Sequence, residues 1–239
     1  MGRTAFMCAA SRDLNTHILK LLLCNGCDVQ AQDNYGKTAL MCAVGQTRDL
    51  AMVSFLLDSD DTSDIADHRG NTALMWTIIG PGQATIIQLL LDEESKINAR
   101  NSTGQTALMI AASVSPKAIV TLLLRKHCDV HVHDNSGETA LIYAVKKLQN
   151  VATVQALLDN GCTFDAVDYR GHTALMAAVE MEGNESTVQL LLDRGGVYDE
   201  GMLLLDNGCK VNMETDDGNT AVDYACSEGA LIALIQRKK

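Results

Sequence analysis

GKTALMCAV, residues 36–44, is one of seven copies of a Gly-x-Thr-Ala phrase in this chain of 239 residues. The copies begin at Gly2, Gly36, Gly70, Gly104, Gly137, Gly171 and Gly218. Their spacings are 34, 34, 34, 33, 34 and 47 residues. A nearly fixed period of this length is typical of proteins built from stacked structural repeats, so the sequence predicts a solenoid.

Each copy predicts a turn followed by two short helices. In the second copy, DNYG at 33–36 is a turn signal, and its glycine is free to adopt a positive φ. Thr38 lies where a helix N-cap is expected, so its hydroxyl should accept a backbone N–H two or three residues later. Apolar residues at 39–44 and 52–57 predict the two helices. The second helices contain triple-Leu runs, which only neighbouring repeats can cover.

The chain resembles the ankyrin-repeat family throughout its length. The matching segments are DNYGKTALMCAV from Asp33, AIVTLLL from Ala118 and NGCDV from Asn25. The resemblance implies an all-α solenoid of seven helix-turn-helix repeats with short protruding turns. Two departures recur. Ala replaces the family's Pro after the capping Thr, and Met usually replaces its His, so apolar packing must substitute for the hydrogen bond of that imidazole.

We expect a single domain over residues 1–239, with repeats that start near residues 2, 33, 67, 101, 134, 168 and 215. A 13-residue insertion falls within 190–215, where the letters LLLD occur twice. It predicts an extra short helix around 199–206, either as a tolerated insertion or as a recognition element with Tyr198 at its tip. The first repeat has no polar capping repeat before it, so its apolar surface should be exposed and the chain is expected to be part of a larger protein.

Composition narrows the function classes. The net charge of −11 argues against a nucleic-acid partner, because phosphate binding needs a basic stripe. The segment 171–217 alone has a net charge of −8 and is either a solvated face or a steering surface for a basic partner. The chain has no apolar run of 18 residues, which predicts no membrane span. Six of its eight cysteines recur at two equivalent repeat positions, too far apart for disulfides, so we expect reduced thiols and a cytoplasmic location. We also expect a monomer.

No catalytic motif is present, and we expect neither an enzyme nor a cofactor. The densest group of potential metal ligands contains His127, Cys128, His131 and His133. An exposed hairpin explains this group better than a transition-metal site, because no carboxylates complete a ligand set.

The resemblance places a protein partner on the concave face, formed by turn tips and first helices. The candidate residues on this face are Asn34, Tyr35, Lys37, His68, Arg69, Asn71, Trp76, Thr103, Gln105, Lys146, Lys147, Tyr169, Arg170 and His172. Trp76, the only tryptophan, is either an interface hot spot or a residue that fills a gap beside 80–82.

The function expected from these features is that of a protein–protein interaction scaffold or adaptor. One alternative is a regulatory or substrate-targeting segment of a larger enzyme, such as a kinase, whose catalytic domain lies outside this chain. Another is a purely structural spacer.

Overall fold

The computed structural model describes residues 2–12, 16–46, 49–59, 64–80, 83–92, 96–114, 116–148, 150–181, 184–194, 213–221 and 223–224. Within these ranges the regular structure consists of twelve helices, and the one β-feature is an isolated bridge between Val167 and Thr173. The helices are α1 (Ala5–Ala10), α2 (Thr16–Cys24), α3 (Ala39–Gln46), α4 (Leu50–Ser59), α5 (Ala73–Ile79), α6 (Ala84–Asp92), α7 (Ala107–Val114), α8 (Lys117–Arg125), α9 (Ala140–Leu148), α10 (Val151–Asp159), α11 (Ala174–Val179) and α12 (Glu185–Arg194). The all-α solenoid predicted from the sequence is confirmed.

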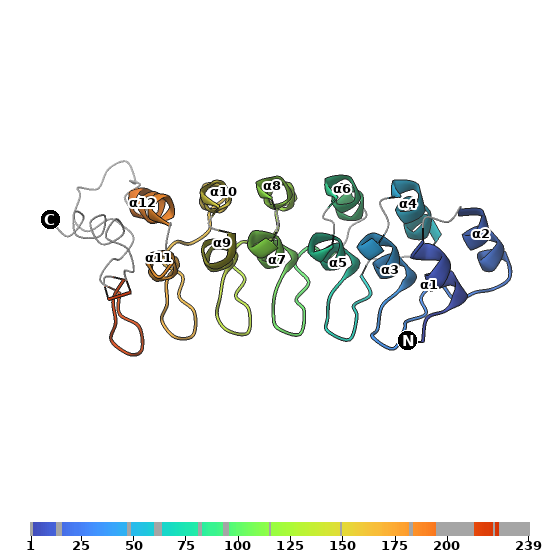
Figure 1. Cartoon of the computed structure of the whole chain (residues 1–239), viewed down its shortest axis with the longest axis horizontal. Coiled ribbons are helices and arrows are strands. Elements are labelled where there is room, and N and C mark those ends of the chain that lie inside the picture. The colour runs from blue at the N-terminus through green and yellow to red at the C-terminus, as the bar shows by residue number, and fades with distance from the viewer. Residues whose placement is uncertain are drawn as a thin grey trace. The chain divides into compact units, whose positions relative to one another are not determined.

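The chain divides into two compact units, Met1–Ala111 with Arg125–Cys128, and Ala112–Leu124 with Asp129–Lys239. In unit 1 the first helices of successive repeats pack side by side, α1 on α3 and α3 on α5, and each first helix packs on its own second helix (Figure 1). In unit 2, α9 packs on α10 and α11, and α12 packs on α10 and α11. The expectation of one domain over residues 1–239 stays a prediction.

The capping role predicted for threonine is confirmed in six repeats. The hydroxyl of Thr38 accepts the backbone N–H of Met41 at 3.3 Å. The same bond, from the residue three positions on, reaches Thr4, Thr72, Thr106, Thr139 and Thr173. Each bond satisfies one of the N–H groups that the first turn of a helix leaves without a partner. The repeated phrase therefore begins a helix by local hydrogen bonding.

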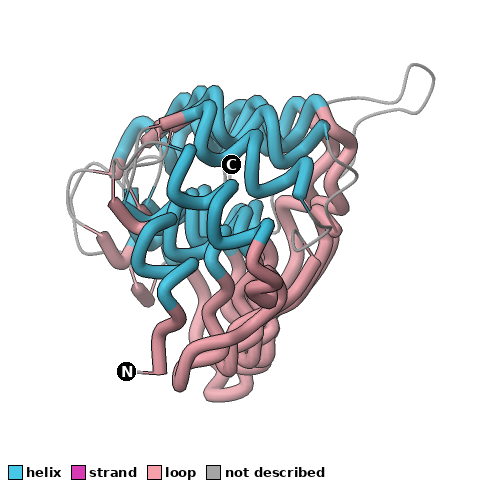
Figure 2. Tube along the Cα trace, turned by 90° about the vertical axis from the view of Figure 1, so that its right-hand side faces the viewer, coloured by secondary structure: helices cyan, strands magenta, loops and turns pink. Residues whose placement is uncertain are grey.

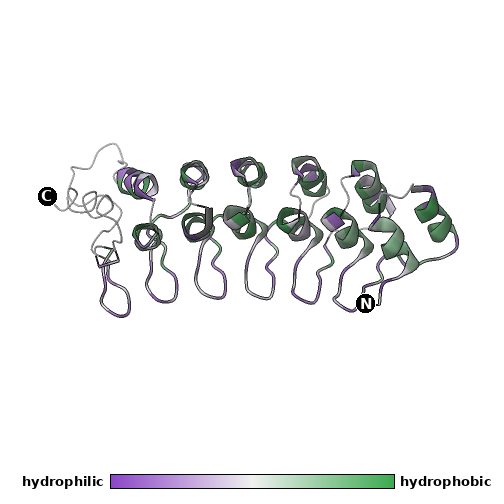
Figure 3. Ribbon diagram, in the orientation of Figure 1, coloured by the Kyte–Doolittle hydropathy of each residue, from purple (hydrophilic) through white to green (hydrophobic). Residues whose placement is uncertain are grey.

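The core of each unit consists of short aliphatic side chains and methionines, and Figure 3 shows apolar residues concentrated in the helices. Met41, Met75, Met109 and Met176 are each 1% exposed, so the methionines that replace the family's histidine are packed in the helix layers. Six residues of α3, from Ala39 to Val44, are buried. Small and unbranched side chains at these positions allow first helices of adjacent repeats to approach closely.

The second helix of the first repeat exposes apolar side chains, as the sequence predicts. Ile18 in α2 is 41% exposed, whereas the residues at the same repeat position in α4 and α6, Met52 and Ile86, are at most 1% exposed. Leu21 is 52% exposed. The predicted helix around 199–206, Tyr198 and the closing segment 230–239 lie outside the described residues.

Hairpin-like turns join successive repeats and project from the helix layers of each unit (Figure 2). Within one turn the N–H of Asp33 donates to the carbonyl of Lys37, and the N–H of Gly36 donates back to the carbonyl of Asp33. Neighbouring tips are joined as well. The N–H of His68 donates to the carbonyl of Tyr35 at 3.0 Å in unit 1. These bonds connect the tips into a continuous backbone layer within a unit.

Candidate protein-recognition surface

A buried carboxylate organises four of the described turns. Asp33, Asp67, Asp134 and Asp168 are between 4% and 7% exposed. In every case Oδ1 accepts the backbone N–H groups two and four residues later, at 2.8–2.9 Å. Asn101 accepts the equivalent pair at 3.1 and 2.9 Å. The turns are therefore held by their own hydrogen bonds, and the tip side chains are not needed for that purpose.

The second oxygen of the turn carboxylate has a partner on the first helix in two repeats. The indole Nε1 of Trp76 donates to Oδ2 of Asp67 at 3.0 Å. The phenol of Tyr143 donates to Oδ2 of Asp134 at 2.9 Å. Both donors lie nine residues after their aspartate, a spacing that is visible in the sequence but was not used to predict this bond.

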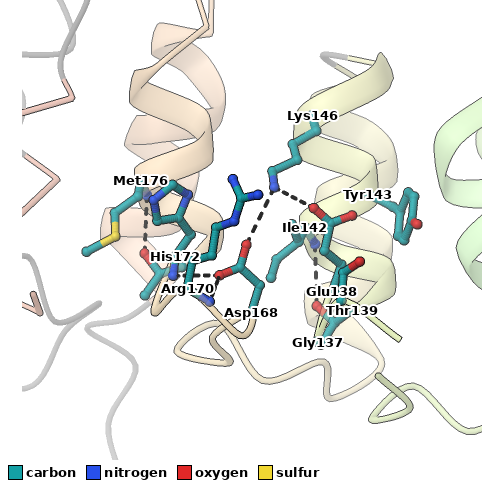
Figure 4. A network of polar contacts seen from close by, with 12 residues as sticks. Gly137, Glu138, Thr139, Ile142, Tyr143, Lys146, Asp168, Arg170, His172 and Met176 are labelled. Carbon is teal, nitrogen blue, oxygen red and sulfur yellow. Dashed lines mark hydrogen bonds and ion pairs between the residues drawn. The ribbon is translucent and has the colours of Figure 1, made fainter. Parts of the chain in front are cut away.

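In two other repeats a cation lies near Oδ2 of the turn aspartate. Arg3 Nε lies 3.9 Å from Oδ2 of Asp33. Lys146 Nζ lies 3.8 Å from Oδ2 of Asp168 and 2.5 Å from the carboxylate of Glu138, as Figure 4 shows. Because Glu138 belongs to the preceding turn, Lys146 links two successive turns of unit 2.

Trp76 is half-buried and supports a cation. The ammonium of Lys37 lies 3.4 Å from the centroid of the indole ring, which is a cation–π geometry. The indole N–H is at the same time bound to Asp67. Trp76 thus connects the turn of its own repeat to the turn of the preceding repeat.

The residues predicted from the sequence to contact a partner differ in exposure. Those exposed are Asn34, Tyr35, His68, Arg69, Thr103, Tyr169 and Arg170. Those half-buried are Lys37, Trp76, Gln105, Lys146 and His172. The side chain of Lys147 lies outside the described part of the structure.

Asn71 is buried, unlike the other described residues predicted for this surface. It is 7% exposed, and its side-chain amide donates to Asp67 Oδ2 at 3.3 Å. Its carbonyl oxygen accepts from the amide of Asn101, in the next turn, at 3.2 Å. The repeat position of Asn71 suggested an exposed tip residue, but this side chain turns inward and links two turns.

Two tyrosines are the most exposed large aromatic side chains among the described residues. Tyr35 in unit 1 is 62% exposed and Tyr169 in unit 2 is 71% exposed. Each is carried by a turn whose backbone is hydrogen-bonded to a buried aspartate. A partner that covers such a tyrosine gains apolar contact at little cost in backbone ordering.

His172 packs inside unit 2 against a residue absent from the predicted surface. Its ring lies 5.1 Å from that of Tyr224 in an edge-on arrangement, and its Nε2 is 3.2 Å from the tyrosine hydroxyl. A backbone hydrogen bond also joins the two tips, since the N–H of Asp216 donates to the carbonyl of Arg170 at 3.2 Å. The last described turn is therefore attached to the preceding repeat.

The histidine-rich hairpin lines a cavity of about 240 Å³ in unit 2. His131 and His133 border it together with Cys162 and Thr163, and the Thr163 hydroxyl lies 3.2 Å from His131 Nδ1. Among the described residues no group of three or more His, Cys, Asp or Glu side chains could hold a metal ion. The structure provides no support for a metal site at this hairpin.

The described cysteines are free thiols in contrasting environments. Cys8 and Cys24 are exposed, whereas Cys42, Cys128 and Cys162 are buried. Burial raises the pKa of the Cys42 thiol above its ordinary value, and the nearby Asp33 carboxylate raises it further, while Arg3 and Lys37 oppose the shift. No described helix is both long and apolar enough to cross a membrane.

Comparison with known proteins agrees with this arrangement. A family model for ankyrin repeats matches three times, at residues 1–67, 46–134 and 115–201, so the chain belongs to the ankyrin-repeat family. Among solved structures, 609 chains match. One of them is the ankyrin repeat domain of Bcl-3, described as a unique member of the IkappaB protein family. It is 25% identical in sequence, and the match has a TM-score of 0.78 and covers 98% of this chain and 99% of that one. A search of curated proteins found no match. Ankyrin repeats generally mediate protein–protein interaction and are non-catalytic scaffolds in general.

Proposed function

We propose that this protein is an interaction scaffold or adaptor that binds another protein through its hairpin tips and the adjoining first helices. One observation carries the proposal. The turns are held by buried aspartates and backbone hydrogen bonds, while Tyr35, His68, Arg69, Tyr169 and Arg170 remain exposed on the tips. A rigid framework that presents variable, exposed side chains is suited to recognition.

The interface would combine the exposed residues with half-buried ones. Tyrosine, tryptophan and arginine dominate the energetics of protein interfaces. Exposed tyrosine and arginine occur on the tips of both units, and Trp76 lies in unit 1. The residues proposed to contact the partner are Asn34, Tyr35, Lys37, His68, Arg69, Trp76, Thr103, Gln105, Lys146, Lys147, Tyr169, Arg170 and His172. A monomer in the cytoplasm is part of the same proposal. The exposed free thiols of Cys8 and Cys24 support the reducing compartment.

Affinity capture with the full chain tests this proposal. Bait proteins carrying Tyr35→Ala or Tyr169→Ala are compared with the unmodified chain in an extract of the native cell, followed by mass spectrometry and a binding titration with the recovered protein. At least one of the two substitutions should weaken binding by about 2 kcal/mol, because both remove exposed aromatic area from a rigid tip. Leu50→Ala is the matched control, since Leu50 is 44% exposed but begins α4 in the second-helix layer. Equal affinity for both tyrosine variants and the unmodified chain would contradict the proposed placement.

A further inference from the structure

The hairpin tips of unit 1 carry cations that are not paired with described carboxylates. Neither Lys37 nor Arg69 forms an ion pair with a carboxylate in the described ranges. The ion pairs of this unit involve other cations, as in Arg3 with Asp33, Lys96 with Asp64 and Lys126 with Asp92. The tip segments 34–37, 68–71 and 102–105 contain one lysine, one arginine and one histidine, and no aspartate or glutamate.

The acidic groups nearest to these tips are already used by the fold. Asp67 accepts two backbone N–H groups on Oδ1 and the indole of Trp76 on Oδ2, and it is 7% exposed. Asp33 accepts two backbone N–H groups on Oδ1, has Arg3 beside Oδ2, and is 5% exposed. A buried carboxylate whose oxygens already accept these donors has few acceptor positions left for direct contact with a further cation. Both carboxylates keep their charge, but neither forms an ion pair with Lys37 or Arg69 in the described part of the chain.

The two residues that carry these charges are joined by a connected set of contacts. Lys37 lies on the ring of Trp76, Trp76 is bound to Asp67, and Asp67 holds the N–H of Arg69. The tips of the two turns are joined by the hydrogen bond from His68 to Tyr35. Because Lys37 is half-buried against the indole, its ammonium loses less conformational freedom on binding than a freely solvated lysine would.

We propose that this cationic tip surface, defined by Tyr35, Lys37, His68, Arg69 and the edge of Trp76, binds an acidic peptide segment of a partner protein. Carboxylates of the segment pair with the Arg69 guanidinium, which can hold them in a bidentate manner, and with the Lys37 ammonium. Tyr35, 62% exposed, supplies apolar contact beside them. This inference rests on the proposed function and adds the chemistry of the partner.

Unit 2 offers a contrast at the same repeat positions. Arg170 corresponds to Arg69, two residues after the turn aspartate. The tip next to it contains the exposed residues Asp216 and Asp217, and the N–H of Asp216 is bonded to the carbonyl of Arg170. These carboxylates repel an acidic segment, so the preference for acidic peptides belongs to unit 1.

Fluorescence anisotropy with the full chain tests the inference. The probe is a labelled peptide in which Glu alternates with Gly and Ser, and the matched peptide has Gln in place of every Glu. The Glu peptide should bind at least about tenfold more tightly than the Gln peptide, and its affinity should fall as salt is raised. Lys37→Met and Arg69→Met should each weaken binding about fivefold, since each removes a charge and keeps much of the apolar stem. Arg125→Met is the control and should leave the affinity unchanged, because Arg125 is an exposed cation in the last turn of α8, on a second helix and not on a tip. Thermal unfolding verifies that all variants fold.

Three results of these binding titrations would overturn the inference. The first is equal binding of the Glu and Gln peptides, and the second is unchanged affinity of both unit 1 variants. The third is tighter binding of a single-stranded oligonucleotide than of the Glu peptide, which would indicate a general polyanion surface. If a captured protein is lost by Tyr35→Ala but retained by both Lys37→Met and Arg69→Met, the proposed function stands and the acidic-peptide inference fails. If the chain captures no protein that depends on Tyr35 or Tyr169, the proposed function fails.

Discussion

Gly36→Ala should destabilise the protein more than Gly26→Ala, although both glycines have nearly the same backbone conformation. Their φ values are +79° and +76°. A Cβ at residue 36 would lie 2.5 Å from the backbone nitrogen of His68 and 2.6 Å from its ring. At residue 26 nothing lies within 4 Å of the added atom. The pair therefore separates the cost of a left-handed conformation from the cost of crowding the next repeat.

The expected magnitudes follow from these two terms. The left-handed conformation costs an L-residue roughly 1–2 kcal/mol, and this cost applies to both variants. At residue 36 the next tip must also move, which strains the 3.0 Å hydrogen bond from His68 to Tyr35 and adds about 1 kcal/mol or more. We expect a loss of about 1–2 kcal/mol for Gly26→Ala and about 2–4 kcal/mol for Gly36→Ala.

Urea unfolding followed by far-UV circular dichroism measures the difference. With a denaturant slope of about 3 kcal/mol/M, the midpoint of Gly36→Ala should fall below that of Gly26→Ala by roughly 0.3–0.7 M. Unit 2 provides a second pair, since a Cβ at Gly137 would lie 2.6 Å from the nitrogen of Tyr169 and one at Gly161 would meet nothing within 4 Å. Equal losses within both pairs would refute the reasoning, because they would show that the neighbouring tip yields without cost.

Three further predictions concern side chains. Tyr143→Phe should lower the free energy of unfolding by about 1.5–3 kcal/mol, because it removes the donor to Oδ2 of the buried Asp134. Tyr169→Phe is the control and should change the free energy of unfolding little, because Tyr169 is exposed. Urea titration measures both. Thr153→Val should raise the thermal midpoint, with a gain of about 1 kcal/mol, because the buried Thr153 hydroxyl has no hydrogen-bond partner among the described residues. A lowered midpoint would contradict this. Iodoacetamide at neutral pH should modify Cys8 before Cys42, since Cys42 is buried and its raised pKa leaves less thiolate at that pH. Peptide mass spectrometry gives the order of modification, and equal rates would exclude this account.

The fold could be predicted because its signals are local. Thr38 caps a helix through the N–H of a residue three positions on, and the aspartates of the turns bind N–H groups two and four positions on. Such bonds depend only on the conformation of a short segment, which a repeated phrase reveals directly. The apolar pattern of the two helices likewise predicts that neighbouring repeats must cover them.

The candidate surface could be predicted only in outline. The repeat positions of Tyr35, Arg69 and Tyr169 suggested tip residues, and all three are exposed. Asn71 was expected at a tip as well, yet its amide is buried between two turns. Position in a repeat indicates where a backbone lies, but the direction of a side chain depends on hydrogen-bond partners in the next repeat.

Trp76 shows most clearly where sequence reasoning ends. Its ring lies under Lys37, which precedes it by a whole repeat, and its N–H is bound to Asp67 at the base of a turn. Residues this far apart meet only after the repeats have stacked, because the period of the chain aligns equivalent turns side by side. The sequence thus determined the helices, the caps and the turns. Stacking decided which turn carboxylates have a partner on the first helix and which cations lack an ion pair among the described residues.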